Sequence, residues 1–285
     1  EGTAVFVVDG HHARLQPVTV GARNGSLAWI RQGLDTGARP LDVAVSADGK
    51  SVFVLSDDGV LSIYTSDGAL TGKISVGAHA ERIAVAPDGG RLYVTHHQGK
   101  RVDVVQLDYV RDINTSGAPS KGREKAPVTI AVFSDFQWAY CAGLAPVLEQ
   151  VLETFPDKVR VVFKNYPLVK SHKFAGKAAL TAHAAHLQGK FWSVHDEFFK
   201  IHDQLNDEKI QEIVRAAGLN EEQLERDRNS QRVVDHVQKD LDEAYRLGIS
   251  SVPTVFVNGK RMRDRSFESL ATAIEKELKK NPAKK

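Results

Sequence analysis

The chain has 285 residues, of which 42% are hydrophobic and 26% charged, and its formal net charge is +2 at pH 7. A charge balance so close to neutral gives no reason to expect binding to nucleic acid or to an acidic membrane surface. No apolar run approaches the roughly 18 residues of a membrane span, and the length favours two domains.

The first predicted elements are short strands at residues 4–8, 15–20 and 27–30. Asp9-Gly10 and Asn24-Gly25 follow apolar runs, and such pairs are typical of tight turns. We therefore expect a small β segment over residues 3–37.

An internal repeat follows, in which residues 42–54 align with residues 82–94. Each copy is a predicted strand, an Asp-Gly turn that supplies the positive φ of a tight hairpin, and a second strand. Further strands are predicted at 61–64 and 102–105, and the first copy adds one at 70–76. Short antiparallel strands at a period of about 40 residues are typical of a propeller blade, and the pattern resembles YVTN- or NHL-type blades.

Residues 1–111 therefore form a predicted β-repeat domain of two blades, or three if residues 3–37 make another. A closed propeller needs about 4–8 blades. Three arrangements stay open: chains pool their blades in a homo-oligomer, the blades pack on the second domain, or the region is a compact sandwich or spacer with no ring. Pooling would cover blade faces and edges that are otherwise exposed.

Residues 112–126 are polar, contain Gly, Pro and Ser, and show no periodicity. This composition predicts an interdomain linker and places the second domain at residues 127–285.

The second domain opens on a stretch that joins a buried strand to a helix. Residues 128–134 are a β-branched, apolar run, and the chain then turns at Ser134-Asp135. Trp138-Ala139-Tyr140-Cys141 follows at the start of a helical pattern of apolar residues. At a helix N-terminus the dipole and the free N–H groups favour a thiolate.

The pattern F-S-D-F-Q-x-x-Y-C-A-x-L-A-P-V-L at residues 133–148 resembles the DsbA-like branch of the thioredoxin superfamily. Members of that branch normally carry Cys-Pro-Tyr-Cys here. In this chain Trp138 stands at the position of the first cysteine and Ala139 at that of the proline. Cys141 is the only cysteine, so no intramolecular disulfide can form.

Later segments extend the resemblance to residues 127–278. They are a strand at 159–165 with Asn-Tyr-Pro-Leu168, the G-K-F-W-x-x-H-D pattern at 189–196, a helical block at 173–248, and a closing helix at 266–278. Val252-Pro253 occupies the place of the family's cis-proline loop, which lies beside the Cys-x-x-Cys motif and pairs with an extended substrate peptide. The resemblance implies an α/β thioredoxin fold with a helical insertion.

Within the helical block, three residues are predicted helix caps: Asn206, Asn220 and Ser230. The last of these begins a helix that ends near Gly248. Its predicted buried stripe is Val233, Val234, Val237, Leu241, Ala244 and Tyr245.

The resemblance places Cys141 at the second, more buried cysteine position, which normally resolves the mixed disulfide. Three roles stay open for it: an inert buried thiol, a monothiol that forms a mixed disulfide with a partner, or part of a binding groove without redox chemistry. Trp138 suits a hydrophobic contact platform or simple packing against the cis-proline loop. Asp135 is either a proton acceptor or a turn or cap residue.

The histidines give no metal prediction. His183 and His186 are three residues apart on a predicted helix, and His195 and His202 follow. A metal needs three or four converging ligands, so we interpret these side chains as solvated, and the pairs His11-His12 and His96-His97 as loop residues. We find no phosphate loop and no Ser/His/Asp arrangement, and we predict no cofactor.

The resemblance implies a thiol–disulfide oxidoreductase or isomerase-family protein with a degenerate active site, weak or monothiol in its redox activity. The site residues are Cys141 and Trp138, with Ala139, Tyr140, Val252 and Pro253 binding substrate. The expected partners are unfolded or cysteine-containing proteins in a periplasmic or other extracytoplasmic compartment, where disulfides form. The alternative is a non-catalytic peptide-binding or scaffold module in which the β-repeat domain drives oligomerisation.

Overall fold

The computed structural model describes residues 3–9, 12–18, 32–46, 49–86, 90–107 and 109–280. The chain divides into two compact units, Glu1–Asp108 and Tyr109–Lys285. The strand predicted at 27–30, the turn at Asn24-Gly25 and His11 lie outside the described residues.

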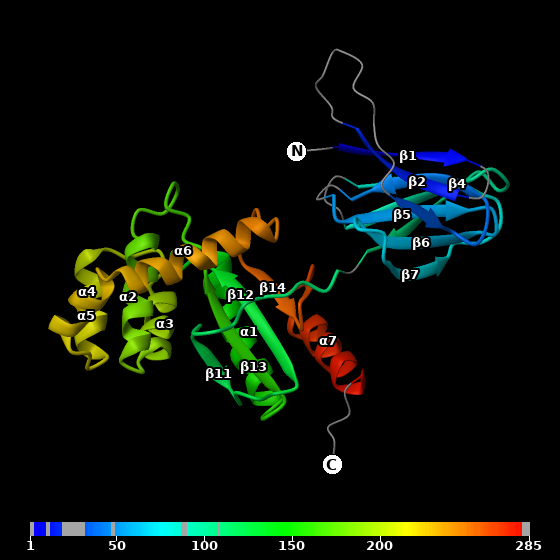
Figure 1. Cartoon of the computed structure of the whole chain (residues 1–285). Coiled ribbons are helices and arrows are strands. Elements are labelled where there is room, and N and C mark those ends of the chain that lie inside the picture. Colours follow the sequence, from blue (N-terminus) through cyan, green and yellow to red (C-terminus); the bar gives the residue numbers. More distant parts are fainter. Residues whose placement is uncertain are drawn as a thin grey trace. The chain divides into compact units, whose positions relative to one another are not determined.

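The described residues of the first unit form three antiparallel sheets (Figure 1). Strands β1 (Thr3–Asp9), β2 (His12–Val18) and β3 (Gln32–Asp35) form one sheet in that order. Strands β4 (Pro40–Val45), β5 (Ser51–Ser56), β6 (Val60–Thr65) and β7 (Leu70–Ser75) form the second, and β8 (Ala80–Val85), β9 (Arg91–His96) and β10 (Arg101–Gln106) form the third. The two copies of the repeat are thus a four-stranded and a three-stranded sheet, and these sheets do not define a propeller.

A hydrogen bond from backbone to side chain links the two copies of the repeat. Asp42 in β4 accepts from the backbone N–H of Ile83 in β8 at 2.9 Å. A small buried cluster joins Leu34 of β3 to Val52, Val54 and Tyr64 of the four-stranded sheet.

The second unit is built on a five-stranded sheet in the order β11-β13-β12-β14-β15. The strands are β11 (Ser120–Gly122), β12 (Val128–Ser134), β13 (Val159–Asn165), β14 (Thr254–Val257) and β15 (Lys260–Arg261). Only β12 and β13 pair in parallel. Helix α1 (Ala139–Thr154) crosses between these two strands, and α7 (Phe267–Lys280) follows β15 (Figure 1).

Five helices separate β13 from β14 and lie together beside the sheet (Figure 1). They are α2 (Ala175–Leu187), α3 (Phe191–Lys200), α4 (Asp207–Ala216), α5 (Glu221–Arg228) and α6 (Gln231–Arg246). The predicted helical insertion is therefore present, and the three predicted caps are confirmed. Asn206 accepts from Lys209 N–H at 2.9 Å, Asn220 from Gln223 N–H at 2.9 Å, and Ser230 from Val233 N–H at 3.4 Å.

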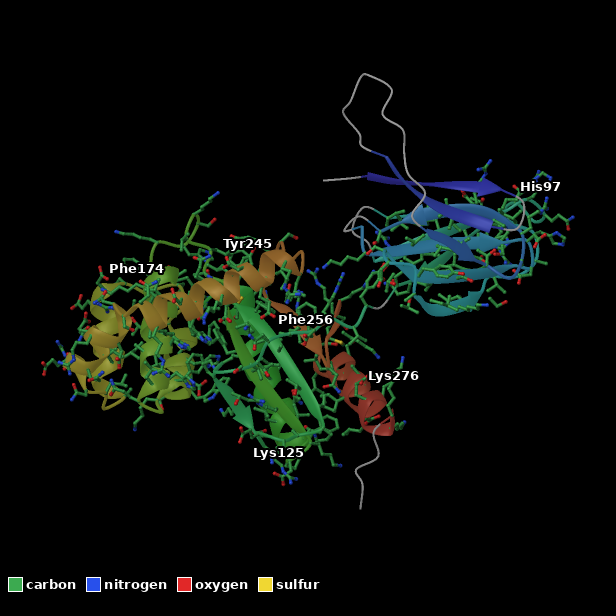
Figure 2. The ribbon with its side chains drawn as sticks, viewed as in Figure 1. His97, Lys125, Phe174, Tyr245, Phe256 and Lys276 are labelled. Atoms are coloured by element: carbon green, nitrogen blue, oxygen red, sulfur yellow. The ribbon has the colours of Figure 1, made fainter. Side chains whose placement is uncertain are left out.

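The buried face of α6 differs from the predicted stripe. Val234 and Tyr245 are exposed, at 40% and 65%, and the outward position of Tyr245 is visible in Figure 2. Asp240 and Glu243 are buried instead. The cause is Lys164 in β13, which is 4% exposed and forms ion pairs with both carboxylates, so the polar side chains occupy the face that contacts the sheet.

The stretch predicted as a linker is partly structural. Ser120–Gly122 pairs with β13 as strand β11. Asn114 accepts from the Lys164 ammonium at 2.8 Å, and its N–H donates to Glu243 at 2.8 Å. The prediction missed this because a short polar strand has no periodicity and its partners lie far away in the sequence.

Aromatic packing fixes the turn that follows β12. Phe136 stacks on Phe163 with ring centroids 5.0 Å apart, and Phe191, Phe198 and Phe199 surround the pair. On the other side of β12, Phe133 meets Phe256 of β14, which is labelled in Figure 2. Burial of this many aromatic rings holds the start of α1 in a defined position.

Candidate functional site

The site begins at the N-terminus of α1. Trp138 is the N-cap residue, and its carbonyl accepts from the N–H groups of Cys141 (2.9 Å) and Ala142 (3.0 Å). Its side chain makes no capping bond. Cys141 therefore lies in the first turn of the helix, where the resemblance places the second cysteine.

The Cys141 thiol is buried, with the residue 2% exposed. Its sulfur accepts from the N–H of Asp135 at 3.4 Å. Burial is the main reason that the pKa of Cys141 is raised to about 11, and the Asp135 carboxylate adds to the rise. Hydrogen bonds from the Asp135 backbone and the Ser134 hydroxyl, and the charge of Arg265, lower it by less. At neutral pH the group is a thiol, which is a poor nucleophile.

The Trp138 indole connects the helix to the loop before β14. Its Nε1–H donates to the Val252 carbonyl at 3.0 Å. The Val252–Pro253 peptide bond is cis, and both residues are buried. The structure thus joins Trp138, the N-cap residue of α1, to Val252 of the cis-proline loop. Tyr140 projects outward, 69% exposed, with its ring 5.2 Å from that of Trp138.

Asp135 organises the turn beneath Trp138. It is 1% exposed, and its carboxylate accepts from the N–H groups of Gln137 and Leu168, both at 2.6 Å. The Nδ1 atom of His172 lies 3.1 Å from the same carboxylate, and the His172 ring is 5.4 Å from that of Trp138. These contacts favour the turn role for Asp135.

Two side chains at the site were missed from the sequence. His172 lies beside Trp138, and Arg265 donates through Nη1 to the Pro253 carbonyl at 3.2 Å. His172 carries no local signal, because its partner is Asp135, distant in the sequence. The alternation of Arg261, Arg263 and Arg265 was visible and could have drawn attention to this segment.

Several histidines differ from their predicted surroundings. His183 and His195 are buried rather than solvated, because His183 stacks on His236 at 3.8 Å and His195 lies among the phenylalanines. His96 ends β9 instead of lying in a loop, and its Nε2 is 3.0 Å from Asp103. Over the described ranges, no group of three His, Cys, Asp or Glu side chains is suited to hold a metal ion.

The thioredoxin family model matches residues 114–276, more than half of the chain. The chain therefore belongs to the thioredoxin family, and its second unit has a DsbA-like thioredoxin fold. A thioredoxin-like oxidoreductase from Silicibacter pomeroyi DSS-3 is similar in structure, with a TM-score of 0.53 and 25% identity, over 57% of this chain and 94% of that one.

Two curated relatives carry different names. The probable disulfide bond formation protein D of Bacillus anthracis is 32% identical over 171 residues, covering 56% of this chain and 78% of that protein. The Na(+)/H(+) antiporter NhaA 1 of Mycolicibacterium gilvum is 33% identical over 161 residues, covering 56% of this chain but only 26% of the antiporter. The chain thus spans about a quarter of the length of the antiporter it matches. In the portion of the chain that the structure covers, no helix has the length and apolar character to cross a membrane.

Proposed function

We propose that this protein is a DsbA-like thiol–disulfide oxidoreductase with a degenerate active site, in which Trp138-Ala139-Tyr140-Cys141 replaces the usual Cys-x-x-Cys. Its redox activity is weak and limited to one thiol. The observation that carries this proposal is the hydrogen bond from the Trp138 indole to Val252, made beside a buried Cys141.

One cysteine limits the chemistry to a monothiol cycle. The Cys141 thiolate would attack a disulfide of the substrate, forming a mixed disulfide and releasing one substrate thiolate. A second thiol, from the substrate or from a small-molecule thiol, would then attack the mixed disulfide and release Cys141 as a thiolate. With a pKa of about 11, about one Cys141 in ten thousand is a thiolate at pH 7, so the first step is slow.

Substrate would lie along the loop that ends at the cis-proline. In this proposed groove, Trp138, Ala139 and Tyr140 would contact the substrate from the start of α1, and Val252 and Pro253 from the loop. The exposed Tyr140 ring beside Trp138 supplies apolar contact area for an unfolded or cysteine-containing protein. The disulfide bond formation protein D among the relatives supports an extracytoplasmic location, because disulfides form and persist there.

The second candidate is a binding module that has lost redox turnover. The 2% exposure of Cys141 favours it, because a sulfur that solvent does not reach cannot attack a substrate disulfide unless Trp138 moves. In this reading the same groove holds extended peptides without covalent chemistry.

We propose the domain boundaries 1–111, 112–126 and 127–285, with assembly into a homo-oligomer through the β-repeat domain. Strand β10 lies at the edge of its sheet, and its Val102 and Val104 are 56% and 58% exposed. Edge strands with exposed apolar residues tend to pair with another chain. Light scattering tests this: a mass above that of one chain is expected, and a monomer at all concentrations contradicts it.

The redox proposal is tested by restoring the missing cysteine. Trp138→Cys should gain insulin-reducing activity that the unmodified chain lacks or shows only weakly. The matched control is the double variant Trp138→Cys with Cys141→Ser, which also opens the site but holds one cysteine. Activity in the double variant equal to that in the single variant would show that a dithiol cycle is not the reason for the gain.

A further inference from the structure

Three arginines alternate along the chain after β14: Arg261, Arg263 and Arg265. All three are exposed, and β15 ends at Arg261, on the outer edge of the sheet. Two of the guanidinium groups bind residues next to the cis bond. Arg265 donates to the Pro253 carbonyl at 3.2 Å, and Arg261 donates to the Thr254 hydroxyl at 3.4 Å.

This basic segment adjoins the groove. Trp138 binds the Val252 carbonyl and Arg265 binds the next carbonyl along, that of Pro253. The charge of Arg265 also acts on the Cys141 thiol, whose pKa it lowers against the larger effect of burial. A polypeptide bound against Trp138 therefore also lies close enough to these arginines to interact with their positive charge.

The one carboxylate inside the segment is bonded to serines rather than to Arg261 or Arg265. Asp264 is the one acidic residue between Arg261 and Arg265, and its carboxylate accepts from Ser266 N–H (3.0 Å), Ser266 hydroxyl (2.8 Å) and Ser269 hydroxyl (2.5 Å) at the start of α7. Among the residues that the structure describes, no carboxylate forms an ion pair with Arg261 or Arg265. By contrast, Arg215 and Arg226 in the helical insertion are paired with glutamates.

The three side chains also repel one another. Partial burial, followed by the charges of Arg265 and Arg263, lowers the pKa of Arg261. Like charges held together on a surface are relieved by an anion, and a guanidinium binds a carboxylate through two parallel hydrogen bonds.

We propose that Arg261, Arg263 and Arg265 form a binding surface for aspartate and glutamate side chains of the polypeptide that occupies the groove. The surface selects substrates with acidic residues close to the segment held at Pro253. This inference rests on the proposed function and names the substrate class of the same groove.

The test uses two fluorescent peptides that share an apolar centre and differ only in carrying glutamates or glutamines at one end. Anisotropy with the full chain at low salt should show the acidic peptide binding about tenfold more tightly, and added NaCl should reduce that difference. The triple variant Arg261→Gln, Arg263→Gln, Arg265→Gln should lose the difference between the two peptides, whatever its affinity for the neutral peptide. Arg215→Gln with Arg226→Gln removes two arginines elsewhere and should keep the difference.

Each outcome decides the question. Equal binding of both peptides overturns the inference but not the proposed function, because the groove still binds polypeptide. A preference for the acidic peptide that survives in the triple variant has the same meaning. Binding of neither peptide overturns the inference together with the proposed function. Tighter binding of a fluorescent single-stranded oligonucleotide than of the acidic peptide also overturns it, because the arginines would then serve phosphates. If the triple variant does not fold, the salt dependence of the unmodified chain decides.

Discussion

The indole N–H of Trp138 donates a 3.0 Å hydrogen bond to the carbonyl oxygen of Val252. These two residues belong to segments that the resemblance brings together as the two sides of a substrate groove. In the family the backbone before the cis-proline pairs with a substrate peptide, whereas here a side chain of the same protein already occupies that carbonyl. The Val252 carbonyl is thus bonded to the residue at the position that the resemblance gives to the first cysteine.

Substitution of Trp138 by Phe should make the Cys141 thiol more accessible to solvent. An aromatic ring stays at this position, but the hydrogen bond of the indole N–H is lost. We therefore expect the free energy of unfolding to fall by about 1 kcal/mol. We also expect alkylation of Cys141 to become several-fold faster. The matched control is Trp192→Phe, because the Trp192 indole also donates to a backbone carbonyl, that of Ser120 at 2.9 Å. The control should lose similar stability without any change in alkylation. Equal acceleration in both variants would mean that loosening of the fold, not the Trp138 contact, governs access.

Replacement of Asp135 by Asn should lower the pKa of Cys141, because the Asp135 carboxylate is one of the causes that raise it. The variant should also lose about 1–3 kcal/mol of stability, since an amide cannot accept from both Gln137 and Leu168 through its two terminal atoms. The pH dependence of alkylation in the folded protein measures the first effect. A shift to higher pH would contradict this account of the Asp135 charge. Glu153→Gln, an exposed change on α1, serves as the control.

Lys164→Met should be among the most destabilising changes in the second unit. The substitution takes the lysine away from buried Asp240 and Glu243 and leaves Glu243 paired with Arg246 at 3.1 Å. Loss of one partner of a buried ion pair costs about 3–5 kcal/mol. Urea unfolding followed by helical circular dichroism measures the loss. Adding Glu243→Gln to Lys164→Met should recover part of it, and Lys158→Met, at an exposed position, should change little. A Lys164→Met variant as stable as the unmodified chain would show that the pairs add nothing.

His183 of α2, which stacks on His236 of α6, predicts a loss of stability in acid. Burial, then the charges of His236, His186 and Arg232, lower the pKa of His183 from 6.5 to about 3. Below pH 6.5 the His183 side chain is therefore protonated in the unfolded chain but stays neutral in the folded chain. The contribution of His183 to stability is thus fully present above pH 6.5 and is lost progressively as the pH falls toward 3. At pH 5 the loss from His183 alone is about 2 kcal/mol.

The variant His183→Phe tests this assignment, because it keeps a ring stacked on His236 and removes one titrating group. Its unfolding free energy should fall less steeply than that of the unmodified chain between pH 7 and pH 4. An identical slope in the two proteins would assign the acid sensitivity to other groups.

The sequence predicted the parts of the fold that local patterns specify. The strand and helix around residues 128–154, the three helix caps and the helical insertion follow from apolar periodicity and from residues whose partners lie within a few positions. Strand β11 was missed because its pairing partner, β13, lies far along the chain. The buried face of α6 was missed because it depends on ion pairs with Lys164 of β13. His172 was missed for the same reason, since its place is set by Asp135.

The residues of the candidate site come from the resemblance, and their roles in binding or redox chemistry stay predictions. Trp138, Cys141, Val252 and Pro253 were identified by resemblance, because the family pattern fixes their positions. That Trp138 would bind the Val252 carbonyl depends on the side-chain torsions of Trp138, for which the sequence carries no signal.

The central claim is that Cys141 is a buried thiol with a raised pKa behind Trp138. It is tested most directly by the rate of alkylation of Cys141 in the native chain from pH 6 to pH 10, followed by mass spectrometry. The account predicts negligible reaction near pH 6, a rate that still rises at pH 10, and rapid reaction once the protein is unfolded in urea. Rapid alkylation of the folded protein near pH 6 would contradict it.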